Sequence, residues 1–207
     1  MNIETQREVV LASSNAGKLR EFSAILQAAG VRMVAQSELG VPEAEEPHLT
    51  FVENALAKAR HASMHTGRPA LADDSGLCVP ALGGAPGVYS ARYASMGGGE
   101  KSDLANNMRL VSHLQRVKDR RAFYVAVLVY MEGPEDPCPL VAEGRWQGEI
   151  VMTPRGENGF GYDPHFWLPE HNCTVAELDP AEKNRSSHRA RALARLLEQL
   201  RDVGAGA

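Results

Sequence analysis

A short polar segment near the start of the chain has the composition of a phosphate-binding loop. Residues 12–19 read ASSNAGKL and resemble the P-loop pattern, although Ala12 replaces its first glycine and Leu19 its metal-binding hydroxyl. A loop of small residues that leads into a helix offers free N–H groups and the positive end of the helix dipole to an anion. The candidate phosphate contacts are Ser13, Ser14, Asn15, Ala16, Gly17 and Lys18. The alternative is a simple strand–helix turn capped by Asn15.

Two pairs of acidic residues are candidates for a metal site. Glu45 and Glu46 lie in an acidic loop, and Asp73 and Asp74 follow the apolar run 69–72, where we expect a short strand to end. Mg²⁺ prefers oxygen ligands and commonly uses one or two carboxylates together with substrate phosphates. A carboxylate beside the ion can also deprotonate a water molecule. The alternatives are a solvated acidic loop and a turn or helix cap, but unpaired buried charge is costly, which favours a function for Asp74.

An aromatic segment and a basic segment complete the candidate groups. Residues 159–164 read GFGYDP, and the flanking glycines leave the Phe160 ring free to stack on a base, unless it is only an aromatic plug. In residues 182–189, Lys183 and Arg189 could donate to a carbonyl or phosphate oxygen, or could belong to an exposed basic helix face. Lys58 is expected on a helix surface, unless that helix borders a cleft. Ser75 lacks the G-x-S-x-G elbow of a serine hydrolase.

Alternating strands and helices are expected to position these groups. Residues 9–12 predict a buried strand, and Leu19, Phe22, Ile25, Leu26 and Ala29 recur at helical spacing. Thr50 and Glu53 form a capping box for a helix to about residue 65. Residues 101–117 predict a helix whose apolar face carries Leu104, Met108, Val111 and Leu114. This alternation indicates an α/β fold with a mixed sheet.

The second half of the chain continues the pattern. Residues 122–131 are apolar on both faces, which predicts a strand at the centre of a covered sheet. Residues 140–152 predict one or two strands interrupted by Gly144 and Gly148. Asp179 and Pro180 begin a helix that continues to the C-terminus, with a break near residues 185–187. Residues 1–207 are expected to form a single domain, with a disordered tail at 204–207.

Composition excludes several classes of protein. The chain has 207 residues, 43% hydrophobic and 23% charged, as in ordinary globular proteins. Its net charge of −4 gives no general attraction for nucleic acid or an anionic membrane. Three scattered cysteines predict free thiols in a reducing compartment. With neither a signal peptide nor a transmembrane span in the sequence, we expect a cytoplasmic protein.

The motifs together resemble those of one family. In order they read SSNAGKLREF, TFVENALAKAR, ALADDSGL with GGAPGVYSARYA, FGYDP and EKNRSSHRA. Each motif is modest, but their combination is similar to the inosine triphosphate pyrophosphatase family, over nearly the whole chain. The resemblance implies an elongated α/β fold with a long mixed sheet and two lobes, with the active site in a cleft between them. It also implies a homodimer and dependence on Mg²⁺.

The resemblance implies a role for each candidate residue. Residues 13–18 would contact the triphosphate, and Glu45 and Asp74 would bind the metal, with Asp74 also accepting a proton. The base and remaining substrate contacts would come from Ser75, Phe160, Gly161, Tyr162, Asp163, Lys183, His188 and Arg189. Pro47 and His48 stand where relatives often have a glycine, which leaves Glu46 as the alternative to Glu45.

The expected reaction converts a non-standard purine nucleoside triphosphate (ITP, dITP or XTP) to its monophosphate and pyrophosphate. Arg189 could donate to the 6-oxo group of the base, where adenine presents an amino group. The alternatives are a related pyrophosphatase for modified pyrimidine nucleotides and a nucleotide-binding module without catalysis. The carboxylates argue against a binding module without catalysis, because carboxylates near a phosphate site do not help to bind phosphate unless a metal is present.

Overall fold

A computed structural model describes residues 7–13, 19, 22–23, 26 and 30–205. The phosphate-loop candidates Ser14, Asn15, Ala16, Gly17 and Lys18 lie outside the described residues. Of the helix expected after Leu19, the structure describes four residues, which are all helical, and Phe22 and Leu26 among them are buried.

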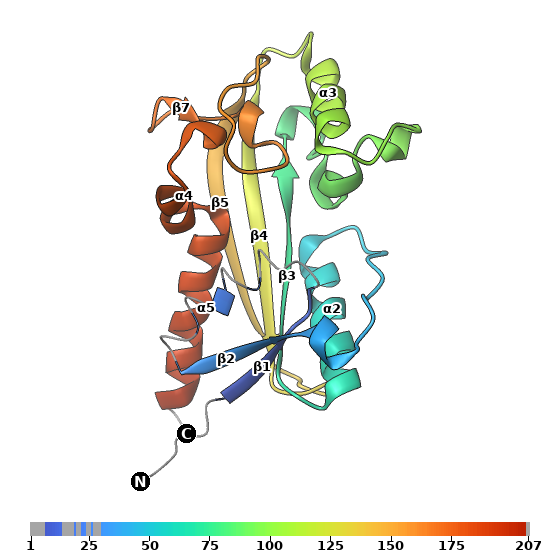
Figure 1. Cartoon of the computed structure of the whole chain (residues 1–207), viewed down its shortest axis with the longest axis vertical. Helices are drawn as coiled ribbons and strands as arrows, with labels where there is room; N and C mark the ends of the chain where they lie inside the picture. Colours follow the sequence, from blue (N-terminus) through green and yellow to red (C-terminus); the bar gives the residue numbers. More distant parts are fainter. Residues whose placement is uncertain (1–6, 14–18, 20–21, 24–25, 27–29, 206–207) are drawn as a thin grey trace. The chain divides into compact units, whose positions relative to one another are not determined.

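Among the described residues, seven strands form one mixed sheet in the order β2-β1-β3-β4-β5-β6-β7. β1 pairs in parallel with β2 and β3, whereas β6 pairs antiparallel with both β5 and β7. The strands are β1 (Arg7–Leu11), β2 (Val31–Ala35), β3 (Ala70–Cys78), β4 (Arg121–Met131), β5 (Leu140–Ile150), β6 (Phe166–Leu168) and β7 (Cys173–Thr174). The predicted α/β class with a mixed sheet is confirmed, and Figure 1 shows β3, β4 and β5 as long neighbouring strands.

The helices begin where their capping residues indicate. The described α-helices are α2 (Phe51–Thr66), α3 (Asp103–Leu114), α4 (Pro180–Ser186) and α5 (His188–Ala205). Thr50 accepts a hydrogen bond from the Glu53 amide, and Asp179 accepts one from the Ala181 amide. Ser187 separates α4 from α5, which confirms the expected break. The last helix ends at Ala205, so it includes two residues of the tail expected to be disordered.

Short 3-10 helices occupy several connections. They are η2 (Gln36–Leu39), η3 (Pro80–Leu82), η4 (Gly87–Arg92), η5 (Ser95–Gly97), η6 (Asp163–His165) and η7 (Val175–Glu177). Two of them, η4 and η5, lie in the glycine-rich region that precedes α3.

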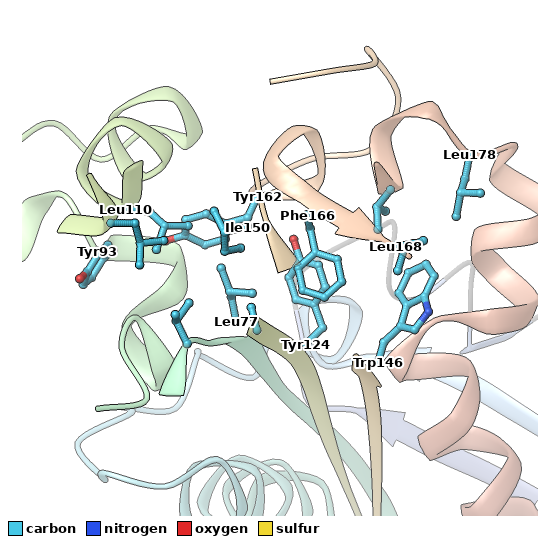
Figure 2. Packing of buried hydrophobic residues seen from close by; sticks show 14 residues of the cluster. Leu77, Tyr93, Leu110, Tyr124, Trp146, Ile150, Tyr162, Phe166, Leu168 and Leu178 are labelled. Carbon is cyan, nitrogen blue, oxygen red and sulfur yellow. The ribbon is translucent and has the colours of Figure 1, made fainter. Parts of the chain in front are cut away.

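The chain divides into two compact units. Unit 1 consists of Met1–Asp74, Val127–Glu143 and Ala192–Ala207, and unit 2 consists of Ser75–Ala126 and Gly144–Arg191. Unit 2 contains a cluster of buried side chains in which Tyr124 and Phe166 lie side by side (Figure 2), with ring centroids 4.5 Å apart. The cleft that the resemblance implies between two lobes stays a prediction.

The strand predicted to end at the acidic pair was wrong in its extent, whereas one of the one or two strands predicted for residues 140–152 is present, without the expected interruptions. β3 does not end at Asp73, because it continues through Asp74 and Ser75 to Cys78. β5 is one strand that passes through Gly148 without interruption. A Cβ at Gly148 would lie 2.5 Å from both the Phe166 ring and the Trp167 carbonyl oxygen, so glycine allows β6 to pack closely there.

The apolar face predicted for α3 was only partly right, because Leu114 is buried and Val111 is half-buried, but its first two members are not. Leu104 and Met108 are exposed, whereas Asn106 and Asn107 are buried together with Leu110. The buried amides have backbone partners: Asn106 Oδ1 accepts from the Ala94 amide at 2.7 Å, for example. The inner face of the helix is therefore partly polar because it satisfies the backbone of neighbouring loops.

Candidate active site

Unit 1 brings two of the candidate carboxylates to one buried lysine. Lys58 Nζ lies 2.9 Å from Asp74 Oδ1 and 2.9 Å from Glu46 Oε1, and it donates to the Asp73 carbonyl oxygen at 2.9 Å. The Lys58 side chain is only 12% exposed, so the prediction of a surface lysine was wrong. The three acceptors satisfy the ammonium group, which explains how a charge can be buried on α2.

Local structure explains how these groups reach one another. Asn54 is one helical turn before Lys58 on α2, and its buried amide bonds to both backbone groups of His48, at 3.1 and 3.2 Å. This pair of hydrogen bonds holds the acidic loop against the helix. Glu46 lies two residues before His48 and faces Lys58, whereas Glu45 is exposed. The sequence carried a signal for Lys58, because positions 54, 58 and 62 share one helix face and the other two are buried.

The electrostatics of this cluster shift the pKa values of both Asp74 and Lys58. Burial raises the pKa of Asp74, and the charge of Lys58 only partly offsets this effect. For Lys58, burial acts to lower the pKa, but Asp74 and Glu46 outweigh it and the pKa is raised. Lys58 is therefore a fixed cation, and Asp74 is a carboxyl group with an increased affinity for a proton.

The free oxygen of Asp74 meets the requirement for a cation ligand. Asp74 Oδ2 is buried, and within the described part of the chain it has no hydrogen-bond partner. Among the same residues, no group of three or more His, Cys, Asp or Glu side chains could hold a metal ion. Two carboxylates alone do not complete a protein cage, but Mg²⁺ typically takes one or two carboxylates and fills its remaining positions with water and phosphate. Asp74 and Glu46 therefore fit Mg²⁺ shared with a phosphate substrate.

Unit 2 brings together the aromatic and basic candidates. Asp163 is buried, and its Oδ2 accepts from Lys183 Nζ at 2.5 Å and from the Phe160 amide at 3.0 Å. Lys183 Nζ lies 4.6 Å from the centre of the Phe160 ring, and the guanidinium carbon of Arg189 lies 5.8 Å from it. Arg189 also donates to Ser75 Oγ at 3.2 Å. The structure thus places two cations next to an aromatic ring that is 61% exposed.

Tyr124 is a member of this group that the sequence reading missed. Its ring stacks on His188 with centroids 4.9 Å apart and an interplanar angle of 15°, and its hydroxyl donates to Asp163 Oδ1 at 3.1 Å. Burial raises the pKa of Tyr124 well above its usual value, so the phenol stays protonated and remains a donor. Tyr124 lies in the strand predicted to be buried, and a buried tyrosine hydroxyl needs a hydrogen-bond partner, so the sequence could have indicated a polar contact here.

The remaining candidates have simpler surroundings. Ser13, the first residue of the phosphate loop, is partly buried, and its amide donates to the Leu11 carbonyl at 2.8 Å. Tyr162 is buried, and its hydroxyl donates to the Ser90 carbonyl at 2.8 Å.

The comparisons with known proteins agree on one family. The model of the Ham1 family matches residues 9–199. The chain is 68% identical to a dITP/XTP pyrophosphatase from Bordetella pertussis, covering 96% of this chain and 93% of that protein. It is 65% identical to a dITP/XTP pyrophosphatase from Burkholderia pseudomallei, covering 94% of each. The solved structure of a HAM1 protein from Coxiella burnetii superposes with a TM-score of 0.90 at 48% identity, covering 95% of this chain and 99% of that one.

Proposed function

The chain belongs to the Ham1 family, and we propose that it hydrolyses non-standard purine nucleoside triphosphates to the monophosphate and pyrophosphate. The names of the relatives support dITP and XTP as substrates, and ITP carries the same base as dITP. The proposal rests on the hydrogen bonding of the two carboxylate oxygens of Asp74. Its carboxylate is held by Lys58 through one oxygen, while the other is buried and has no partner among the described residues.

Asp74 and Glu46 would hold Mg²⁺. The position of Glu46 beside Lys58 supports it in place of Glu45, whose side chain is exposed. The bound ion would supply positive charge that offsets the charge of the phosphate chain. Lys58 would hold both carboxylates in place while it remains protonated, because its own pKa is raised.

Asp74 is the group we assign to proton transfer. Its buried Oδ2 has no hydrogen-bond partner among the described residues, so it would take a proton from the water that attacks the α-phosphorus. The bond from this phosphorus to the bridging oxygen then breaks, and pyrophosphate leaves. The phosphate chain would be held by residues 13–18, of which Ser13 lies within the described part of the chain and Lys18 lies outside it.

The unit 2 residues would read the base. Phe160 is exposed and would stack on the purine, with Gly161, Tyr162 and Asp163 around it. Lys183 and Arg189 lie beside that ring, and either cation could donate to the 6-oxo group. Adenine has an amino group at this position, so a donor would face a donor and a buried polar group would be left unpaired. Such a mismatch can lower kcat/KM for the wrong substrate by roughly 10⁴–10⁵-fold. Ser75 and His188 would complete these contacts.

Assembly and location also remain proposals. The resemblance that implies the enzyme implies a homodimer, and the free cysteines Cys78, Cys138 and Cys173 support a reducing, cytoplasmic location. Within the described residues, no helix combines the length and the apolar character needed to cross a membrane.

The decisive test measures which phosphate product forms. The protein is incubated with Mg²⁺ and ITP, XTP, dUTP or 5-methyl-UTP, and pyrophosphate and orthophosphate are assayed separately. We expect pyrophosphate from ITP and XTP, and a loss of about 10²–10⁴-fold in kcat in Asp74→Asn with the fold retained. Orthophosphate would indicate γ-cleavage, and preference for the uracil nucleotides would indicate a pyrimidine enzyme. Binding without turnover would indicate a nucleotide receptor.

A further inference from the structure

The ring assigned to base stacking receives little support from side-chain packing. Phe160 is 61% exposed and stands between Gly159 and Gly161, both of which have left-handed backbone conformations with φ of 81° and 62°. The position of the ring therefore depends on the backbone conformation of the turn, because neither flanking residue has a side chain that could hold the turn in place. Besides the cations of Lys183 and Arg189 beside the ring, hydrogen bonds to the backbone of this turn position Phe160.

Helix α3 binds the turn through Gly161. Asp103 Oδ2 accepts from the Gly161 amide at 2.7 Å, and Asn107 Nδ2 donates to the Gly161 carbonyl oxygen at 2.7 Å. Asn107 is buried and donates also to the Asp103 carbonyl at 2.9 Å, so the two side chains are themselves connected. Both hydrogen-bonding groups of Gly161 are thus engaged by side chains one turn apart on one helix.

The other side of the turn is anchored to the core. Asp163 accepts from the Phe160 amide at 3.0 Å, and the Tyr162 ring belongs to the same buried cluster as Leu110 of α3 (Figure 2). Asp163 also binds Lys183, so it belongs to the base-reading group already described. Asp103 and Asn107 contact neither Lys183 nor Arg189 among the interactions described, and their link to the base runs through Gly161.

We propose that Asp103 and Asn107 act as a clamp that positions Phe160 for base stacking, and hence that they are specificity-determining positioning residues on α3. This inference rests on the proposed function, because it concerns the base of that substrate. The clamp explains why α3 turns a polar face inward and leaves Leu104 and Met108 exposed. A helix that only covered the core would gain more from burying the two apolar side chains.

The clamp predicts a specific kinetic effect. Stacking of a base on an aromatic ring is worth roughly 5- to 150-fold in affinity. In Asn107→Leu, which removes both donated hydrogen bonds at similar volume, we expect KM for ITP to rise about fivefold or more while kcat changes less. Asp103→Ala should act in the same direction, whereas Asp103→Asn keeps an accepting oxygen and should restore most of the affinity.

A double-mutant cycle separates the clamp from a general loss of stability. In the Phe160→Ala background, Asn107→Leu should change KM by less than about twofold, because the ring that it positions is gone. The matched control is Ser102→Ala, which removes the N-cap hydrogen bond of α3 to the Ala105 amide without touching Gly161. It should lower the melting temperature and leave KM unchanged.

Two further outcomes decide the proposal. Hydrogen exchange of the peptide that contains residues 158–163, measured without nucleotide, should accelerate in Asn107→Leu but not in Ser102→Ala. Equal losses in the wild-type and Phe160→Ala backgrounds, or no loss in either, would overturn the clamp while leaving the pyrophosphatase intact. Failure of the wild-type protein to release pyrophosphate would instead overturn the proposed function, and with it the role of the clamp.

Discussion

Lys58→Met removes the cation that bonds both Glu46 and Asp74. The side chain keeps its approximate length and its apolar stem, but the ammonium group and its three hydrogen bonds are lost. Asp74 and Glu46 then face each other without a positive charge between them. Because Asp74 is buried, water can screen this repulsion only in part.

The size of the effect follows from the two distances. Each carboxylate oxygen lies 2.9 Å from Lys58 Nζ, so the two oxygens are at most about 6 Å apart. At that separation two like charges repel by about 3 kcal/mol for an effective dielectric constant of ~20. For a chain of this length, such a loss corresponds to a fall in melting temperature of about 6–12 °C.

The assay is thermal unfolding with and without the metal. We expect the full deficit of Lys58→Met in EDTA and a smaller deficit in Mg²⁺, because the ion restores positive charge between the carboxylates. Lys118→Met, at an exposed lysine, is the control and should melt like the wild type. A deficit below about 2 °C in EDTA would refute the reasoning from buried charge. A deficit that Mg²⁺ leaves unchanged would count against a metal site at Glu46 and Asp74.

Two further substitutions test the metal ligand and the base contact. Glu46→Gln should raise the Mg²⁺ concentration needed for half-maximal activity about tenfold or more. Glu45→Gln, at the exposed neighbour, should change this concentration little. A larger effect of Glu45→Gln than of Glu46→Gln would make Glu45 the metal ligand. Arg189→Ala should lower kcat/KM for ITP by about 10- to 150-fold, the value of a charged hydrogen bond, and affect residual ATP hydrolysis less. An equal loss for both nucleotides would remove Arg189 from base readout.

Local signals in the sequence were sufficient for the helix starts and the central strand. Thr50 and Asp179 cap their helices as predicted, because a cap depends on residues only two or three positions away. The apolar run 122–131 became β4, with only its first residue, Arg121, added to the predicted range. These features depend only on residues that are close together along the chain, so the sequence alone is sufficient to predict them.

The candidate residues were chosen because their types suit phosphate, metal and base chemistry, and the family resemblance supplied the role of each. Asp163 and Lys183 were assigned to one base site, and the structure places them in contact. What the sequence could not show was the partner of each group. Lys58 was expected on the surface, and β3 was expected to end at the acidic pair, although it continues through both aspartates.

The tertiary structure decided these points because the partners are distant along the chain. Lys58 and Asp74 are 16 residues apart, Tyr124 and Asp163 are 39 apart, and Asn107 and Gly161 are 54 apart. A polar side chain can be buried only where the fold brings such a partner within hydrogen-bonding distance, since an unsatisfied charge or amide in the interior is costly. The sequence by itself determined which groups were present for the chemistry. Only the folded chain decided which of them are buried, which are paired, and which oxygen of Asp74 has no hydrogen-bond partner among the described residues.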